Sequence, residues 1–181
     1  MVSGAGTIGN LVAQAVIASG AKRVLITDVS DYRLEIARRC GISETLNVLH
    51  TPLKDAVREV FADEGFQVCF EVAGVESSLR SLMESVEKGG TVVVVAVFGE
   101  DPRLSMFHLG EHELNLVGTM MYRHEDYLLT VKNIADGSIK LDALISNIFP
   151  FEKYAQAYKF IDESRGKSMK VIINLDASDS N

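Results

Sequence analysis

The chain has 181 residues, of which 47% are hydrophobic and 24% charged, the composition of a folded globular domain. A net charge of −7 argues against a nucleic-acid partner, because phosphate neutralisation needs basic side chains. With no apolar run long enough to span a bilayer and no signal peptide, we expect a cytoplasmic protein without membrane contact. Cys40 and Cys69 stand alone in apolar segments and are expected as free buried thiols.

The most informative segment, residues 4–9, is a G-x-G-x-x-G pattern with Gly4, Gly6 and Gly9. This pattern is typical of the turn between the first strand and the first helix of a dinucleotide-binding unit. The first glycine permits a tight turn, the second lets a pyrophosphate approach, and the third lets the helix pack on the strand. Only three residues precede the pattern, so we expect that upstream sequence is missing.

An apolar helix over Asn10–Ser19, closed by Gly20, and a buried strand over Val24–Asp28 are expected next. Asp28 ends the strand 19 residues beyond the last glycine of the pattern. A dinucleotide site needs a carboxylate there to accept hydrogen bonds from the adenosine ribose. The structural alternative is that Asp28 only begins a turn and caps the next helix. A carboxylate also repels a 2′-phosphate, so the sequence predicts NAD rather than NADP.

Strands and helices continue to alternate along the chain. We expect helices over Asp31–Cys40 and Ser78–Val86, and between them a helix that has Thr51 as N-cap and Pro52 in its first turn and that ends at Gly65. We expect strands over Thr45–Leu49, Gln67–Phe70, Thr91–Val97 and Asn115–Thr119. This alternation predicts an α/β fold, a Rossmann doubly wound parallel sheet of order 3-2-1-4-5-6. Ligands bind such sheets at the carboxyl ends of the strands, where the strand order reverses.

The pattern changes after Gly118. We expect a helix over Glu125–Asp136, an extended stretch over Lys140–Phe149, a helix over Glu152–Glu163, a strand over Met169–Leu175 and a frayed tail over Asp176–Asn181. The sequence therefore predicts an NAD-binding Rossmann domain over residues 1–122 and a C-terminal α/β segment over residues 123–181.

Further motifs run across the whole chain in a fixed order. They are residues 4–9, Asp28, residues 71–76, residues 89–95, residues 113–118, Tyr122-Arg123 and residues 169–172. Together they resemble the cofactor domain and C-terminal segment of zinc-dependent medium-chain dehydrogenases of the sorbitol (iditol) and threonine dehydrogenase type. The resemblance implies NAD as cofactor and, in the full-length enzyme, hydride transfer between NAD and a secondary alcohol or polyol.

The resemblance also implies a role for each cofactor-binding residue. Gly4, Gly6, Thr7, Ile8 and Gly9 would hold the pyrophosphate, Thr7 and Ile8 through backbone N–H groups. The adenosine end of the cofactor would contact Asp28, Val29 and Arg33. The nicotinamide side would be lined by Ala73, Gly74, Val95, Ala96 and Val97. The nicotinamide end would be covered by Met121, Tyr122 and Arg123. Leu116 to Thr119 would pair with the same strand of a second subunit, giving a homodimer.

In that family an N-terminal domain supplies the ligands of the catalytic zinc, and this sequence does not contain it. We therefore expect zinc only in a full-length enzyme, no catalytic residues here, and no dehydrogenase activity of the isolated chain. One alternative is an inactive, truncated nucleotide-binding or dimerisation domain. Another is an S-adenosylmethionine-dependent methyltransferase, which would need a terminal antiparallel strand beside the fifth strand.

His108 to His112 form an H-x-x-E-H pattern, which is typical of inverted zinc peptidases. Those enzymes place the pattern on a regular helix so that both imidazoles share a face. Gly110 and the strand that follows favour a short connector instead, and no third ligand is evident. We therefore predict no metal site at these histidines.

Overall fold

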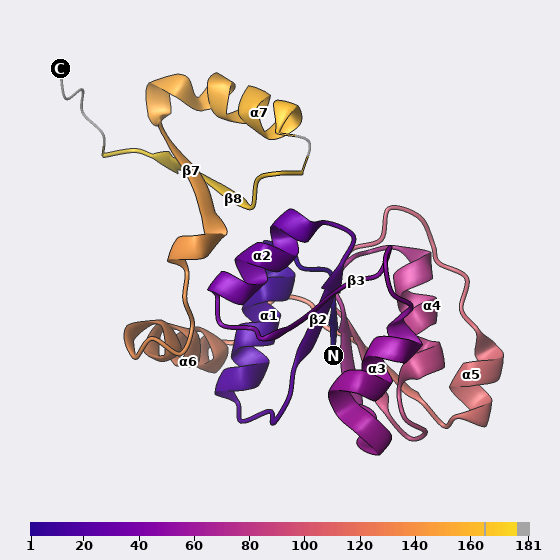
Figure 1. Ribbon diagram of the computed structural model, residues 1–181. Helices are drawn as coiled ribbons and strands as arrows, with labels where there is room; N and C mark the ends of the chain where they lie inside the picture. The colour runs from indigo at the N-terminus through magenta and orange to yellow at the C-terminus, as the bar shows by residue number, and fades with distance from the viewer. Residues whose placement is uncertain (165, 177–181) are drawn as a thin grey trace.

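The computed structural model describes residues 1–164 and 166–176. Six parallel strands form one sheet of order β3-β2-β1-β4-β5-β6, which confirms the Rossmann fold (Figure 1). The strands are β1 Val2–Ser3, β2 Leu25–Asp28, β3 Glu44–Asn47, β4 Val68–Glu71, β5 Thr91–Val94 and β6 Asn115–Gly118. The order reverses between β1 and β4, so the carboxyl ends of these two strands flank the point where ligands bind in such sheets.

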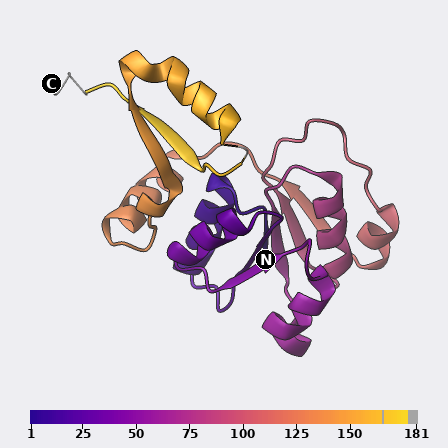
Figure 2. The same cartoon turned by 45° about the horizontal axis from the view of Figure 1, so that its top comes forward.

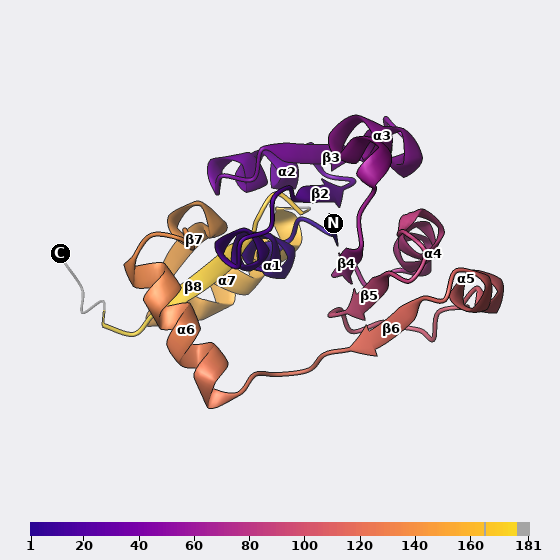
Figure 3. The same cartoon turned by 90° about the horizontal axis from the view of Figure 1, so that it is seen from below.

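Helices cover both faces of the sheet, as Figures 1 and 3 show. The helices are α1 Thr7–Ala18 and α2 Asp31–Arg39 on one face, and α3 Leu53–Phe61, α4 Glu76–Ser85 and α5 Met106–Glu111 on the other. Successive residues of a strand point to opposite faces, so Leu25 joins the core with α4 while Ile26 joins the core with α1 and α2. Burial on both faces explains why β2 is a continuous apolar run.

Helix ends follow local sequence signals. Gly20 and Gly41 have positive φ angles of 92° and 96° just beyond α1 and α2, as expected for residues that end helices. Ser30 is the N-cap of α2, and its side chain accepts a hydrogen bond from the Arg33 N–H. The alternative given for Asp28 is therefore correct for the turn, which Asp28 begins, but wrong for the helix cap, which is Ser30.

Three local predictions are wrong. Thr51 does not cap α3, because Pro52 occupies the N-cap and the Thr51 N–H donates to Asn47 in the preceding turn. The fifth strand ends at Val94 rather than Val97, because the Ala96 N–H donates to the Glu71 carbonyl, which already accepts the ladder bond from Val95, and so departs from the register. His108 lies in a short helix, α5, whereas the sequence favoured a short connector in place of a helix.

The C-terminal part forms a separate small unit, seen at the upper left of Figure 2. Helix α6 His124–Ala135 precedes two parallel strands, β7 Ile145–Pro150 and β8 Lys170–Asn174, which are joined by α7 Tyr154–Glu163. Short 3₁₀ turns at 142–144 and 151–153 replace the expected starts of the extended stretch and of the second helix. Of the expected frayed tail, residues 177–181 lie outside the described residues.

This unit attaches to the Rossmann sheet through α1 and α2. The backbone N–H of Lys140 donates to the Gln14 side chain at 2.6 Å, and Leu144 packs with Ile36 and Cys40. Arg123 is the N-cap of α6, so the expected division between residues 122 and 123 falls at a helix start; it stays a prediction. Over residues 1–164 and 166–176, every helix is too short or too polar to cross a membrane.

Candidate functional site at the glycine loop

Residues 4–9, here called the glycine loop, carry β1 into α1. Gly4 has a φ of +101°, and a Cβ on it would stand 2.9 Å from the Ala73 nitrogen. A Cβ on Gly9 would overlap the carbonyl oxygen of Gly4. Gly6 is different, since no heavy atom of the described residues other than residues 5–7 lies within 4 Å of a Cβ placed there. The first and third glycines are thus demanded by backbone packing, and the second leaves an open space.

The N-terminus of α1 opens onto that space. The first N–H groups of a helix have no partner inside the helix, and within the described residues no side chain caps this end. Thr7 and Ile8 belong to this first turn. Fully buried Asn10 donates from Nδ2 to the carbonyls of Ala5 and Gly6, at 2.7 and 3.1 Å. These bonds hold the loop in the shape that exposes the helix terminus, a favourable place for an anion.

Asp28 links the end of β2 to the glycine loop. Its side chain is only 5% exposed, and Oδ2 accepts the Ala5 N–H at 2.7 Å and lies 3.7 Å from Nη1 of Arg33. Oδ1 accepts the N–H groups of Val29 and Ser30, at 2.8 and 2.9 Å. Nε of Arg33 is buried and finds no partner among the described residues. The carboxylate therefore has a structural role and also lies at the edge of a cavity.

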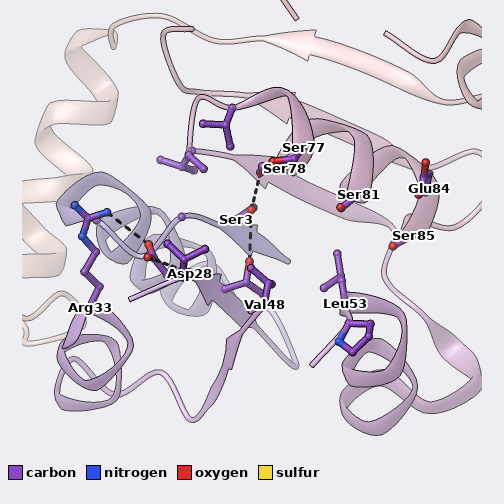
Figure 4. Close-up of a pocket in the computed structure, with 18 of the residues that line it drawn as sticks. Ser3, Asp28, Arg33, Val48, Leu53, Ser77, Ser78, Ser81, Glu84 and Ser85 are labelled. Carbon is purple, nitrogen blue, oxygen red and sulfur yellow. Dashed lines mark hydrogen bonds and ion pairs between the residues drawn. The ribbon is translucent and has the colours of Figure 1, made fainter. Parts of the chain in front are cut away.

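The cavity has a volume of about 730 Å³, within the range of small-molecule sites, and Figure 4 shows it in close-up. Six of the expected cofactor-binding residues line it: Gly4, Gly6, Asp28, Val29, Arg33 and Ala73. Residues that the sequence reasoning missed also line it, among them Ser3, Val48, Leu53, Ser77, Ser78 and Ser81. No sequence motif marked these serines, because only the packing of α4 beside β1 brings them to the cavity.

The expected nicotinamide side lies in two adjoining loops, residues 72–75 (the β4 loop) and 95–98 (the β5 loop). Gly74 has a φ of +70°, and a Cβ on it would stand 3.1 Å from the Val97 carbonyl oxygen and 3.4 Å from the Ala96 Cβ. The two loops are therefore in contact, and Ala73 reaches the cavity. Gly74 and residues 95–97 do not line it.

Met121, Tyr122 and Arg123 follow β6 and lie apart from the cavity lining. Met121 and Tyr122 are 77% and 68% exposed, and Met121 has a φ of 62°, unusual for a residue with a side chain. The structure therefore brings Gly4 and Gly6 together with the expected adenosine residues at the cavity, whereas Thr7, Ile8 and Gly9 do not line it. Closure of residues 121–123 over a nicotinamide stays a prediction.

His108 in α5 and His112 at the C-cap of that helix pack against each other. Their ring centroids lie 5.1 Å apart at an angle of 80°, and Nδ1 of His108 is 2.8 Å from the Ser105 hydroxyl. Within residues 1–164 and 166–176, no three His, Cys, Asp or Glu side chains come close enough to hold a metal ion.

Both cysteines are free and buried, as expected. Burial raises the pKa of the Cys69 thiol to about 12 and also raises the pKa of the Cys40 thiol. Both thiols therefore stay protonated at neutral pH and are poor nucleophiles.

With this geometry established, comparison with known proteins identifies the class. Residues 7–136 match the model of the zinc-binding dehydrogenase family, and the chain belongs to that family. The L-threonine 3-dehydrogenase of Legionella pneumophila (strain Corby) is 32% identical over 176 residues, covering 96% of this chain and 51% of that protein. The chain thus spans about half the length of the curated relatives it matches.

Solved structures agree with the fold. L-idonate 5-dehydrogenase from Escherichia coli K-12 is 28% identical, with a TM-score of 0.84 over 96% of this chain and 49% of that one. An alcohol dehydrogenase from Escherichia coli CFT073, complexed with NADH, has a TM-score of 0.82 at 23% identity, over 94% of this chain and 50% of that one. Within the described residues β4 and β6 both pair with β5 in parallel, so the antiparallel strand that the methyltransferase alternative requires is not found beside β5.

The residues present fit the pyrophosphate and adenosine portions of a dinucleotide. Gly6 leaves space beside the uncapped terminus of α1, and a cavity lined by Asp28 and Arg33 adjoins it. The same test fails for zinc, because the described residues gather no set of three ligands.

Proposed function

We propose that this chain is the NAD(H)-binding portion of a zinc-type alcohol or polyol dehydrogenase. The open space at Gly6, beside the uncapped N-terminus of α1 and the Asp28 carboxylate, carries the proposal. In a full-length enzyme the dinucleotide would exchange a hydride with a secondary alcohol or polyol. Membership of the zinc-binding dehydrogenase family supports this reaction class.

The residues of this chain would bind and orient the cofactor. The N–H groups of Thr7 and Ile8, together with the helix dipole, would stabilise the pyrophosphate. Three N–H groups of the chain already use part of the acceptor capacity of the Asp28 carboxylate, which leaves room for a hydrogen bond from the adenosine ribose. Its negative charge would disfavour a 2′-phosphate, so we expect NAD to bind better than NADP.

A second candidate is a nucleotide-binding domain without turnover. The lack of a three-ligand metal cluster in residues 1–164 and 166–176 favours it for the chain as given. We also propose that the protein is cytoplasmic, because its two cysteines are free thiols, as is usual in a reducing compartment.

Titration calorimetry of the purified chain with NADH, NADPH and S-adenosylmethionine tests the main proposal. We expect NADH to bind more tightly than NADPH and S-adenosylmethionine not to bind. An assay with NAD⁺, zinc and a polyol panel tests the expectation that the chain alone has no dehydrogenase activity, and turnover by the chain itself would refute the second candidate. Absence of NADH binding at millimolar concentration would refute both.

We also propose a homodimer formed through residues 116–119. β6 is the last strand of the sheet and pairs with β5 alone among the described strands. An unpaired strand edge can add a strand from a second copy. Light scattering should give a dimer mass at micromolar concentration. Val117→Lys, on a side chain 46% exposed, should give a monomer, while Ile17→Lys, 41% exposed on α1, should not. A monomeric parent chain would contradict this proposal.

A further inference from the structure

Glu71 is a fully buried acidic residue at the carboxyl end of β4, with 0% of its surface exposed. Burying a carboxylate is unfavourable unless hydrogen bonds replace its lost hydration. The residue stands where the strand order of the sheet reverses, directly before the β4 loop. A buried charge in that place calls for a specific partner set.

The partners of Glu71 are backbone N–H groups of two loops. Oε1 accepts from Ala73 and Gly74, each at 3.1 Å, and Oε2 accepts from Gly74, also at 3.1 Å. The main-chain oxygen of Glu71 accepts from Val95 at 2.9 Å and from Ala96 at 3.1 Å. One residue therefore holds the start of the β4 loop through its side chain and the start of the β5 loop through its backbone.

These loops have little freedom to shift independently. Gly74 approaches the Val97 carbonyl so closely that a Cβ would lie 3.1 Å from the oxygen. On the other side, the Ala73 nitrogen would lie 2.9 Å from a Cβ on Gly4, so the glycine loop is packed against the same segment. A change at Gly74 would therefore displace the β5 loop through its contact with Val97.

We propose that Glu71 is a positioning residue for the nicotinamide half of the dinucleotide. Its carboxylate, which only accepts hydrogen bonds, keeps the Ala73 and Gly74 N–H groups turned inward and so sets the β4 loop against the β5 loop. The pyrophosphate and adenosine contacts depend on Asn10 and Asp28 instead. This inference rests on the proposed NAD(H) binding.

Glu71→Gln is the informative change, because it keeps the shape and places an amide NH₂ opposite the Gly74 N–H. NADH and ADP-ribose, which lacks the nicotinamide, are titrated against the parent chain and the variant. We expect NADH to bind at least tenfold more weakly to the variant, with ADP-ribose within twofold of the parent value. The increase in nicotinamide fluorescence that accompanies NADH binding should also be smaller for the variant than for the parent chain. Glu35→Gln, on an exposed residue paired with Arg38, is the matched control and should change neither affinity.

Gly74→Ala gives a second route that leaves the carboxylate intact. At a φ of +70° and 3.1 Å from the Val97 oxygen, the new methyl should force the two loops apart and lower NADH affinity selectively. If either folded variant loses NADH and ADP-ribose binding equally, or loses neither, the positioning role is refuted. If the parent chain does not bind ADP-ribose, the proposed function itself is refuted. If the parent chain binds ADP-ribose as tightly as it binds NADH, only the role of Glu71 is refuted.

Discussion

Alanine substitutions at the second and third glycines of the loop should separate ligand binding from folding. At Gly6 the backbone has φ −65° and ψ −175°, an extended conformation open to any residue, and no described heavy atom outside residues 5–7 is within 4 Å of the new methyl. Alanine there restricts the unfolded chain, which contributes about 0.4–1 kcal/mol of stability. Alanine is also a poorer N-cap than glycine by roughly 0.5–1 kcal/mol. The two terms oppose each other, so we expect the melting temperature to stay within about 2 °C of the parent value.

Gly9→Ala should behave in the opposite way. Its methyl would overlap the Gly4 carbonyl oxygen and stand 2.8 Å from the carbonyl carbon, both backbone atoms. Overpacking against a rigid neighbour costs about 3 kcal/mol. For a domain of this size that corresponds to a fall in melting temperature of roughly 6–12 °C.

Thermal unfolding and NADH titration on the same samples give the comparison. Gly6→Ala should keep its melting temperature yet bind NADH at least tenfold more weakly, a loss of about 1.4 kcal/mol, because its methyl occupies the space left for the pyrophosphate. Parent-like NADH affinity of Gly6→Ala would refute the location of the site. Parent-like stability of Gly9→Ala would refute the packing described for the loop.

Three further predictions concern charge and protonation. The Asp28→Asn variant should bind NADH about tenfold more weakly and should prefer NADH over NADPH less strongly than the parent chain does. A ratio of NADH to NADPH affinity that calorimetry finds unchanged would contradict the role given to the carboxylate. Burial lowers the pKa of the Met1 ammonium of the 181-residue chain from 8.0 to about 6. The unfolded chain then binds more protons between pH 6 and 8, so the free energy of unfolding should fall by up to about 3 kcal/mol as the pH drops through that window. Urea titrations at both pH values measure this, and acetylation of the amino terminus should remove the slope. Because burial raises the pKa values of the Cys40 and Cys69 thiols, a disulfide reagent at pH 8 should label neither in the native protein and both after denaturation, and rapid native labelling would disprove their burial.

Local sequence signals predicted most of the Rossmann sheet. The buried run ending at Asp28, Gly20 and Gly41 beyond the helix ends, and the alternation through β6 each act over a few residues, and the structure agrees with all of them. The error at the end of the fifth strand came where a distant partner decides. The fifth strand ends early because the Ala96 N–H donates to the Glu71 carbonyl, more than twenty residues away, out of the strand register.

The same distinction between local signals and distant partners applies to the candidate site. Sequence alone determined the glycine pattern, the carboxylate that ends β2 and the family resemblance, because each depends on residue type and spacing. Only the tertiary structure decided that buried Asn10 holds the loop carbonyls, that the serines of α4 line the cavity and that Glu71 joins two loops. These contacts join elements that are separate in the chain, and a buried polar group has a defined role only once its hydrogen-bond partners are known.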